Sequence, residues 1–262
     1  MIKKLFAQSG ILRSIFFPIL GQFDFQIRIK HDFTKRSFYL KSWSHKGYWY
    51  YGLSREGEEV DRFKELIKKG SNILEVGGHI GHVTQLFESL VGNSGKVLVA
   101  EPTKESLFYL KKNVLSSTTI LPVAVSDKIG KLNFFTEHYG GYTNSLVEDF
   151  TSSMNTNLSI THRTKPKSIK KTEVDSTTID QICKDKQYSP NFIKIDVEGA
   201  EYNVLIGGKE TLQSVDSLMV EISRSNQEVY NFLYGLDFRA IHKDGNPVKK
   251  NDYPSGNIFF IK

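Results

Sequence analysis

The most regular hydrophobic pattern of the chain lies within residues 72–91. A short apolar run, residues 73–76, ends at two adjacent glycines, Gly77 and Gly78. Apolar residues then recur with helical spacing, at Ile80, Val83, Leu86, Phe87, Leu90 and Val91. This order predicts a buried strand, a glycine turn and a helix. Glycines at such a turn allow a ligand to approach the backbone closely, because no Cβ stands in the way.

The same order repeats further along the chain. Residues 97–100 form a second apolar run, residues 103–114 have helical spacing, and residues 120–125 form a third run. Alternating strands and helices are typical of a parallel, doubly wound sheet. The sequence therefore predicts an α/β fold whose ligand lies at the carboxyl ends of the strands.

The second half of the chain extends this sheet. Strands are predicted at residues 169–174, 192–195 and 217–221, and helices after Thr177 or Thr178 and at residues 227–234. A further helix is expected to follow Glu201 and to include Val204, Leu205 and Leu212. Residues 238–242 and 258–261 are predicted to form a terminal antiparallel pair.

The first 54 residues have a different character and are predicted to form an N-terminal extension. Residues 23–29 alternate apolar and polar side chains and are expected to pair with residues 37–43 as a β-hairpin. Residues 1–20, from Met1 to Leu20, are apolar and basic but interrupted, so they suit neither a membrane-spanning helix nor a secretory signal. They fit a helix docked on the domain or an interfacial helix that touches lipid.

Aromatic residues follow the hairpin, at Trp43, Tyr48, Trp49, Tyr50 and Tyr51. Such a cluster can stack on sugars or bases, or it can be a packed cap. A helix is predicted at residues 56–68. The remaining chain, residues 55–262, is expected to be the main domain.

A long polar segment interrupts this domain after a predicted antiparallel strand at residues 131–136. Residues 138–164 are rich in Ser, Thr, Asn and Gly, and a structureless loop of this length is usually functional or disordered. We expect a lid or substrate loop at about residues 137–168. The basic stretch at residues 163–171 fits a solvated face or recognition of an anionic acceptor.

Composition narrows the choice of class. Apolar residues make up 39% of the chain, which argues against general disorder. The single cysteine, Cys183, excludes an intramolecular disulfide and fits a reducing compartment, so a cytoplasmic protein with peripheral membrane contact at most is expected. The net charge of +6 permits an anionic partner without demanding one.

Acidic residues occur where three strands end, at Glu75, Glu101 and Asp127. Glu101 follows Gly81 by twenty residues, a position suited to hydrogen bonding the hydroxyls of a ribose. The dinucleotide pattern G-x-G-x-x-G is not met. An adenosine ligand with a charged tail therefore fits better than a pyrophosphate, and a nicotinamide oxidoreductase is a weak alternative.

The most acidic stretch of the chain is NFIKIDVEGAEY, residues 191–202. It places Asp196, Glu198 and Glu201 at the mouth of a buried strand, which is costly unless they bind something. Glu221 ends the next strand. These acids could serve as a general base, as ligands of a divalent metal ion or as an anchor for a cationic ligand. The sequence does not separate these roles, so no metal ligand is assigned.

These stretches resemble the FkbM family of S-adenosylmethionine-dependent methyltransferases. The resemblance runs in order from about Arg55 to Glu221, and its most specific motif is FIKIDVEGAE. The others are ILEVGGHIGHVT, VAEP, LPVAVSD, TNSL, VDSTTID and VEIS. The family implies a class I, Rossmann-like, seven-stranded sheet, mostly parallel with an antiparallel C-terminal strand. It also implies methyl transfer to oxygen, often a hydroxyl of a sugar, glycan or natural product.

The resemblance also implies roles for single residues. Glu75, Gly77, Gly78 and Gly81 correspond to the methionine side of the cofactor site, Glu101 with Pro102 to the ribose ligand, and Ala124 with Asp127 to the adenine side. Asp196 and Glu198 lie where the family has its active-site acids. We expect Asp196 to be the base, with Glu198 or Glu221 next. His79 is a departure, because the family usually has Asn there to contact the cofactor.

Two other functions compete with this one. A nucleic-acid or RNA methyltransferase fits the basic charge, but the basic residues are scattered and no tetrapeptide suited to amine acceptors occurs. A non-catalytic, Rossmann-like binding module of a glycan assembly is the second alternative. The acceptor and the oligomeric state are not given by the sequence.

Overall fold

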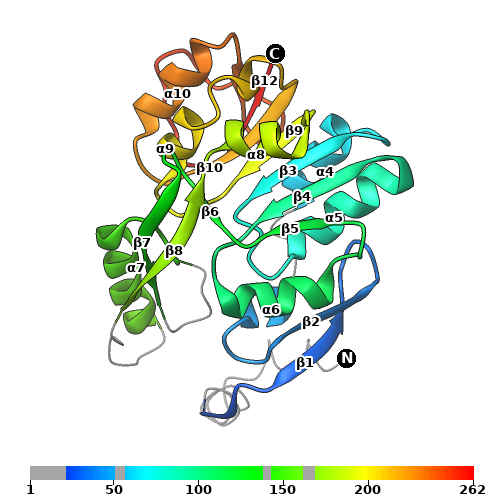
Figure 1. The fold of residues 1–262 in the computed structure, drawn as a ribbon, viewed down its shortest axis with the longest axis vertical. Coiled ribbons are helices and arrows are strands. Elements are labelled where there is room, and N and C mark those ends of the chain that lie inside the picture. Colours follow the sequence, from blue (N-terminus) through cyan, green and yellow to red (C-terminus); the bar gives the residue numbers. More distant parts are fainter. Residues whose placement is uncertain (1–21, 51–56, 138–142, 162–168) are drawn as a thin grey trace.

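The computed structural model describes residues 22–50, 57–137, 143–161 and 169–262 (Figure 1). The predicted helix at residues 1–20 and most of the basic stretch at residues 163–171 lie outside these ranges. Within them, no helix is both long and apolar enough to cross a bilayer.

A seven-stranded sheet forms the centre of the molecule. Its spatial order is β11 (Arg239–Ile241), β12 (Gly256–Ile261), β10 (Ser217–Ile222), β9 (Phe192–Ile195), β3 (Asn72–Val76), β4 (Lys96–Ala100) and β5 (Thr119–Leu121). Strands β10, β9, β3, β4 and β5 are parallel, and β12 runs antiparallel to both of its neighbours. The predicted mostly parallel sheet with an antiparallel C-terminal strand is confirmed. The strand order reverses between β3 and β9, and crevices at such points bind ligands.

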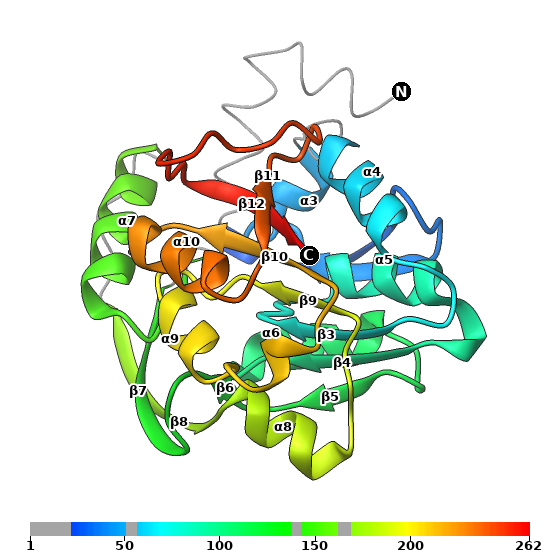
Figure 2. The ribbon, with the colours of Figure 1, turned by 90° about the horizontal axis from the view of Figure 1, so that it is seen from above.

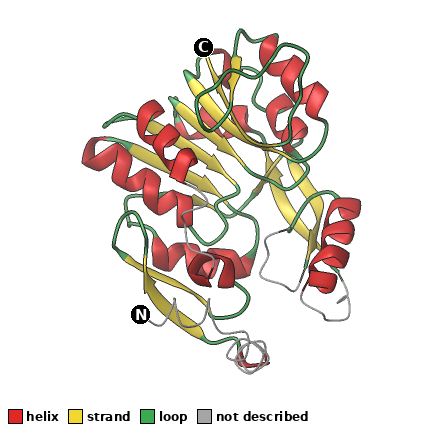
Figure 3. Cartoon of the chain, turned by 180° about the vertical axis from the view of Figure 1, so that it is seen from behind, coloured by secondary structure: helices red, strands yellow, loops and turns green. Residues whose placement is uncertain are grey.

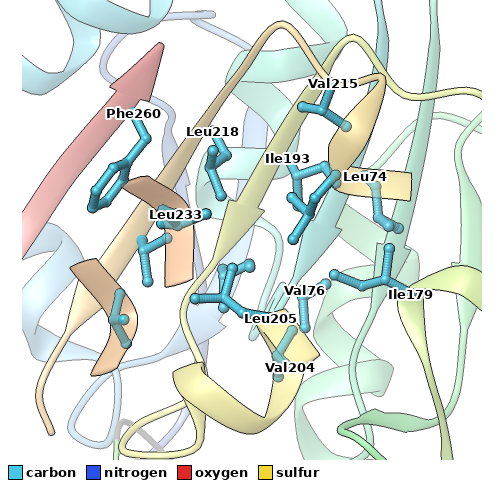
Figure 4. Close-up of a cluster of buried hydrophobic side chains, with 14 of the residues drawn as sticks. Leu74, Val76, Ile179, Ile193, Val204, Leu205, Val215, Leu218, Leu233 and Phe260 are labelled. Atoms are coloured by element: carbon cyan, nitrogen blue, oxygen red, sulfur yellow. The ribbon is translucent and has the colours of Figure 1, made fainter. Parts of the chain in front are cut away.

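Helices cover both faces of this sheet, as Figure 2 shows from above. Successive strand residues point to opposite faces, so Leu74 and Ile73 belong to different clusters of buried side chains. Leu74 packs with α8 (Ile179–Lys186), α9 (Glu201–Ile206) and α10 (Asn226–Tyr234), the core drawn in Figure 4. Ile73 packs with α4 (Gly57–Leu66) and α5 (His82–Val91). The α/β, doubly wound fold follows from this division.

Helix signals in the sequence were mostly correct. Thr178, not Thr177, caps α8, because its hydroxyl accepts a hydrogen bond from the Gln181 N–H at 3.0 Å. The helix expected after Glu201 is shorter than predicted. It ends at Ile206, and Leu212 lies in the 3-10 turn η3 (Thr211–Gln213).

The third strand predicted near residues 120–125 is divided in two. Strand β5 ends at Leu121, and β6 (Ala124–Val125) joins a separate three-stranded sheet with β8 (Lys170–Thr177) and β7 (Gly130–Thr136). Pro122 has no N–H to donate, and the Val123 N–H turns back to the Leu121 carbonyl at 2.9 Å. The chain therefore leaves the central sheet at this proline.

The long polar segment is not structureless, which corrects our prediction. Residues of α7 (Glu148–Thr161) form a helix beside the second sheet, visible in Figure 3. Two acidic residues, Glu148 and Asp149, occupy its first turn, where the helix dipole favours negative charge. Phe150 and Thr151 are buried, and they fix the helix on the domain.

The predicted hairpin is confirmed as β1 (Gln26–Lys30) and β2 (Ser37–Lys41), followed by the short helix α3 (Lys46–Tyr50). Buried polar side chains join it to α5 and to α6 (Lys104–Asn113). Asn113 accepts from the Tyr39 N–H at 2.7 Å and donates to the Tyr39 carbonyl at 2.9 Å. Gln85 donates to the Ser37 carbonyl at 3.1 Å. The hairpin is therefore an integral part of the fold.

Candidate functional site

A cleft of about 760 Å³ opens at the carboxyl ends of β3, β4, β9 and β10. Its walls include eight of the residues that we predicted for the site: Gly77, His79, Glu101, Pro102, Ala124, Asp196, Glu198 and Glu221. Volumes of this size are typical of small-molecule and cofactor sites. The sequence motifs at residues 72–81 and 191–202, more than a hundred positions apart, thus meet in one place.

Gly77 lies where β3 and β9 come closest. Its φ of 87° is in the left-handed region, and a Cβ at this position would lie 1.8 Å from the Asp196 carbonyl oxygen. The Gly77 N–H donates to the Ala100 carbonyl at 3.0 Å. The turn therefore fits against the end of β9 only without a side chain.

We expect Gly77→Ala to lower the free energy of unfolding by at least about 3 kcal/mol, because the backbone must move to make room for the methyl group. Gly92→Ala is the matched control. Gly92 also has a positive φ, 65°, with ψ −163°, but its added Cβ meets no heavy atom within 4 Å, so it should lose only the cost of its backbone conformation, about 1 to 3 kcal/mol. Urea unfolding measures both. Equal losses would show that backbone conformation, not contact with Asp196, explains the glycine.

The other two predicted glycines serve packing. A Cβ on Gly78 would lie 2.1 Å from Val99 Cγ2, and one on Gly81 would lie 2.8 Å from Leu110 Cδ1. Neither glycine is among the described residues that line the cleft. Close packing therefore accounts for both glycines, and their contact with the methionine side of a cofactor stays a prediction.

Glu101 is almost fully buried beside the glycine turn, 6% exposed. Its Oε2 accepts from the His79 N–H at 3.0 Å, and its Oε1 accepts from the Thr103 N–H at 2.9 Å and the Thr103 hydroxyl at 2.5 Å. A carboxylate offers about four acceptor positions. One position on Oε2 is therefore left for a hydroxyl in the cleft.

His79 has a strained backbone, with φ 44°, and its side chain points back to the extension. Its Nδ1 lies 3.0 Å from the Tyr48 hydroxyl, with which it shares a hydrogen bond. The Tyr48 ring also stacks against the histidine, with the ring centroids 6.1 Å apart. Tyr48, in the helix after the hairpin, thus holds the side chain of His79, the residue that departs from the resembled motif.

Three carboxyl groups meet at the ends of β9 and β10. Asp196, Glu198 and Glu221 are half-buried, and each offers a carboxylate oxygen within 4.8 Å of the others. Lys194, 3% exposed, lies beneath them, with Nζ 2.8 Å from Asp196 Oδ2. Oxygen clusters of this kind suit magnesium or calcium, and they equally suit proton transfer.

The three acids differ in their readiness to ionise. Burial opposes ionisation of Asp196, but the Lys194 ammonium and a hydrogen bond from Glu221 hold its pKa below the usual value. The Asp196 charge, followed by burial, raises the pKa of Glu221 to about 10. Burial, followed by the Asp196 and Glu201 charges, raises the pKa of Glu198 to about 9. At neutral pH the cluster therefore holds one carboxylate between two neutral carboxyl groups.

Glu75 lies behind the cleft and is not among the described residues that line it. It is 1% exposed, accepts from the Thr84 hydroxyl at 2.6 Å and lies 3.8 Å from Lys194 Nζ. Burial raises its pKa to about 7, although Lys194 and Thr84 lower it in part. Glu75 therefore affects the carboxyl groups of the cleft through its contact with Lys194.

Asp127 is not among the described residues that line the cleft, although Ala124, three residues earlier, forms part of its wall. Its Oδ1 accepts from Asn203 Nδ2 at 3.2 Å and from the Ser126 hydroxyl at 3.0 Å. Burial opposes ionisation, but these hydrogen bonds hold the pKa of Asp127 below its usual value. Its place on the adenine side of a cofactor stays a prediction.

Glu201 also has a local role. It accepts from the Gly199 N–H at 2.7 Å and from the Ser223 hydroxyl at 3.2 Å, at the beginning of α9. It therefore shapes the turn that presents Glu198.

Sequence reasoning missed Lys194 and several residues of the cleft wall. The missed wall residues come from helices α3 and α4, from strand β12 and from loops: Gly47, Glu59, Asn144, Leu146, His242, Lys243, Ser255 and Asn257. Two signals were available. Asn144 belongs to the TNSL motif, and Asn257, the cross-strand partner of Glu221, directly precedes the strand predicted at residues 258–261.

Comparison with known families gives one match. A family model described as the methyltransferase FkbM domain matches residues 75–240. This range contains every site residue that we predicted. No curated protein matches the chain.

Solved structures give distant likenesses, and these concern the fold alone. A precorrin-6y C5,15-methyltransferase from Geobacter metallireducens has 10% identity and a TM-score of 0.44, covering 79% of this chain and 88% of its own. An O-methyltransferase from Bacillus cereus in complex with SAH has 12% identity and a TM-score of 0.41, with coverages of 80% and 81%. Fibrillarin from Aeropyrum pernix, with natively bound S-adenosyl-L-methionine, has 10% identity and a TM-score of 0.40, with coverages of 91% and 81%.

Proposed function

The chain belongs to the FkbM-domain methyltransferases, which use S-adenosylmethionine, and from this premise we propose that it methylates a hydroxyl oxygen of a sugar, glycan or natural product. The observation that carries the proposal is the cluster of Asp196, Glu198 and Glu221 in the cleft, in which the Lys194 ammonium lies 2.8 Å from Asp196 and favours its ionised form. A hydroxyl acceptor must lose a proton, and Asp196 can take it. Membership of this methyltransferase family argues against the two alternatives of a nicotinamide oxidoreductase and a non-catalytic binding module.

The residues present in the cleft fit the cofactor. When bound, S-adenosylmethionine supplies an electrophilic methyl group on a cationic sulfur. The free acceptor position on Glu101 suits a ribose hydroxyl, and the Gly77 backbone forms part of the same cleft wall. The negative charge of Asp196 favours a cationic group nearby. Glu101, Pro102, Gly77, His79 and Ala124 would hold the cofactor.

Asp196 acts as general base in this scheme. A hydroxyl of the acceptor donates its proton to the Asp196 carboxylate as the oxygen becomes the nucleophile. The protonated Glu198 and Glu221 can donate hydrogen bonds to other oxygens of the acceptor and so orient it. Lys194 keeps Asp196 ionised. A divalent ion bound by the three acids would be a second way to activate the hydroxyl, and loss of activity in EDTA would favour it.

We propose that residues 137–168 contribute to the acceptor site as a substrate lid. Asn144 and Leu146 line the cleft, and the Ser145 hydroxyl donates to the Glu198 carbonyl at 2.6 Å. Phe150 of α7 lies against Gly199. These contacts connect the segment with the turn that presents Glu198.

The cofactor site is tested by titration calorimetry with S-adenosylhomocysteine. Glu101→Ala removes the ribose hydrogen bond and should weaken binding about 10- to 150-fold, as expected for a hydrogen bond to a charged group. Glu105→Ala, an exposed acid four residues away, is the control and should bind like the wild type. Unchanged affinity in Glu101→Ala would remove Glu101 from the site.

The acceptor is tested with labelled S-adenosylmethionine and a panel of free sugars, nucleotide-linked sugars, glycans and RNA. We expect label on a sugar or glycan oxygen. Label on RNA alone, with binding that falls steeply as salt rises, would instead support the nucleic-acid alternative.

A further inference from the structure

Basic residues occur along the whole chain, but its net positive charge lies in the first fifty residues, where acidic residues are few. They contain nine lysines and arginines and two acidic residues, a net charge of +7, whereas the whole chain carries +6. The remaining 212 residues, including the methyltransferase cleft, are therefore close to neutral. The extension, not the enzyme core, is the basic part of this protein.

Aromatic side chains are exposed in the same region. Phe23 and Phe25, just before β1, are 60% and 51% exposed, and their rings stack with centroids 5.9 Å apart. Phe108 of α6 is 53% exposed. Exposed phenylalanines grouped together on a folded protein indicate an interaction site more often than isolated ones do.

The hairpin and α6 meet at the open end of the hairpin, where Gln26 follows Phe25 in the chain. The Lys112 ammonium donates to Gln26 Oε1 at 2.7 Å and lies 4.0 Å from the centre of the Phe108 ring. Lys41 pairs with Glu105, one turn before Phe108. Figures 1 and 3 show the hairpin and α6 side by side at the end of the molecule remote from α10.

The charges on this surface are positive and outward. We call it the hairpin–α6 face and define it by Phe23, Phe25, Phe108, Arg28, Lys30, Lys104 and Lys111, all of them exposed. Two acids beside this face, Asp24 and Glu105, have partners of their own. Asp24 accepts from the Trp43 N–H at 2.7 Å and the Ser44 N–H at 3.1 Å, and Glu105 pairs with Lys41.

We propose that the hairpin–α6 face binds an anionic membrane surface. Basic residues supply attraction to acidic headgroups, and the phenylalanines can enter the interface between headgroups and acyl chains. The sequence next to this face is suited to the same surface. Residues 1–21 carry three basic and no acidic residues among many aliphatic and aromatic ones.

Two other occupants fit less well. The segment 1–21 has the same sign of charge as the face, so charge complementarity gives no reason to choose it as the occupant. RNA would match the charge and could stack on phenylalanine. RNA offers no apolar surface that would bind the aliphatic residues preceding the face, such as Ile11, Leu12 and Ile15.

Sedimentation of the full chain with lipid vesicles tests the proposal. We expect binding to vesicles of phosphatidylcholine with phosphatidylglycerol, weak binding to phosphatidylcholine alone, and loss of binding as NaCl rises from about 0.1 to about 0.5 M. Lys104→Glu with Lys111→Glu should weaken binding at least about tenfold. Phe23→Ser with Phe25→Ser should weaken it and leave the salt dependence in place.

Two control pairs make comparable substitutions on other surfaces, one of lysines by glutamates and one of exposed apolar residues by serines. Lys184→Glu with Lys186→Glu alters α8, which packs on the opposite face of the sheet, and Ile129→Ser with Ile206→Ser replaces exposed apolar residues elsewhere. Both should bind vesicles like the wild type. Equal losses in control and test pairs would overturn the proposal, as would absence of vesicle binding or preference for RNA over vesicles.

Calorimetric binding of S-adenosylhomocysteine by each variant reports that its fold is intact. This readout also keeps the membrane proposal distinct from the methyl-acceptor proposal. Vesicle binding does not depend on which hydroxyl is methylated, so either can fail while the other stands.

Discussion

Asp196→Asn is expected to lower kcat at least about a thousandfold, because it removes the carboxylate that accepts the hydroxyl proton while leaving a side chain of the same shape. Asn can still accept a hydrogen bond from Lys194, so the local structure should survive. Binding of S-adenosylhomocysteine should be preserved. Single-turnover methyl transfer, measured beside the calorimetric titration, separates the chemical step from cofactor binding.

Glu198→Gln is the matched control for this loss. Because Glu198 is protonated at neutral pH, an amide of the same shape can replace it as a donor, and kcat should fall less than about tenfold. Glu221→Gln should behave alike for the same reason. Wild-type turnover in Asp196→Asn would remove Asp196 from the scheme. A larger loss in Glu198→Gln than in Asp196→Asn would make Glu198 the base.

Lys194→Met is expected to lower activity about a hundredfold at pH 7 and to change its pH dependence. The ionised form of Asp196 is the reactive one, so activity is present above the pKa of Asp196 and is lost as the pH falls through it. Lys194 holds that pKa down. Without the ammonium, burial raises the pKa, and the acid limb of the kcat/KM profile moves to higher pH. A merely structural lysine would leave the position of this limb unchanged.

The same substitution is expected to lower the free energy of unfolding by about 3 to 5 kcal/mol, because it leaves Glu75 and Asp196 buried without their cation. A second variant keeps the test sharp. Without the ammonium the buried Glu75 is mostly protonated at pH 7, so Glu75→Gln combined with Lys194→Met should have about the same stability and pH profile as Lys194→Met alone. Lys96→Met, an exposed lysine on β4, is the control. A double variant with the wild-type profile would refute the role of Lys194.

The parts of the fold that the sequence predicted well are those with strong local signals. Apolar runs of β3, β4, β9 and β10 are buried on both sides, so their composition alone marks them. The failures have local causes too. Pro122 ends β5 because it lacks an N–H, and this divided one predicted strand between two sheets. The polar composition of residues 148–161 suggested a loop, but α7 forms there and packs on the domain through the buried side chains of Phe150 and Thr151.

The candidate site was predictable where its residues lie in the turns at strand ends. Glu101 and Asp196 line the cleft for this reason. Side-chain direction was not predictable. Glu75 points behind the cleft to Thr84, and Asp127 turns to Asn203 on a neighbouring helix. His242 and Asn257 reach the cleft from the C-terminal pair, a contact that only the complete sheet creates.

The anchoring of the hairpin has a consequence for how the protein is made. Tyr39 forms its hydrogen bonds with Asn113, 74 residues later. At roughly 5 to 20 residues per second, a ribosome needs about 4 to 15 s to synthesise the intervening chain. During this time Phe38 and Leu40, fully buried in the finished protein, lack the helices that cover them. The hairpin is therefore completed only after the first two strands of the central sheet in chain order, β3 and β4, have been made.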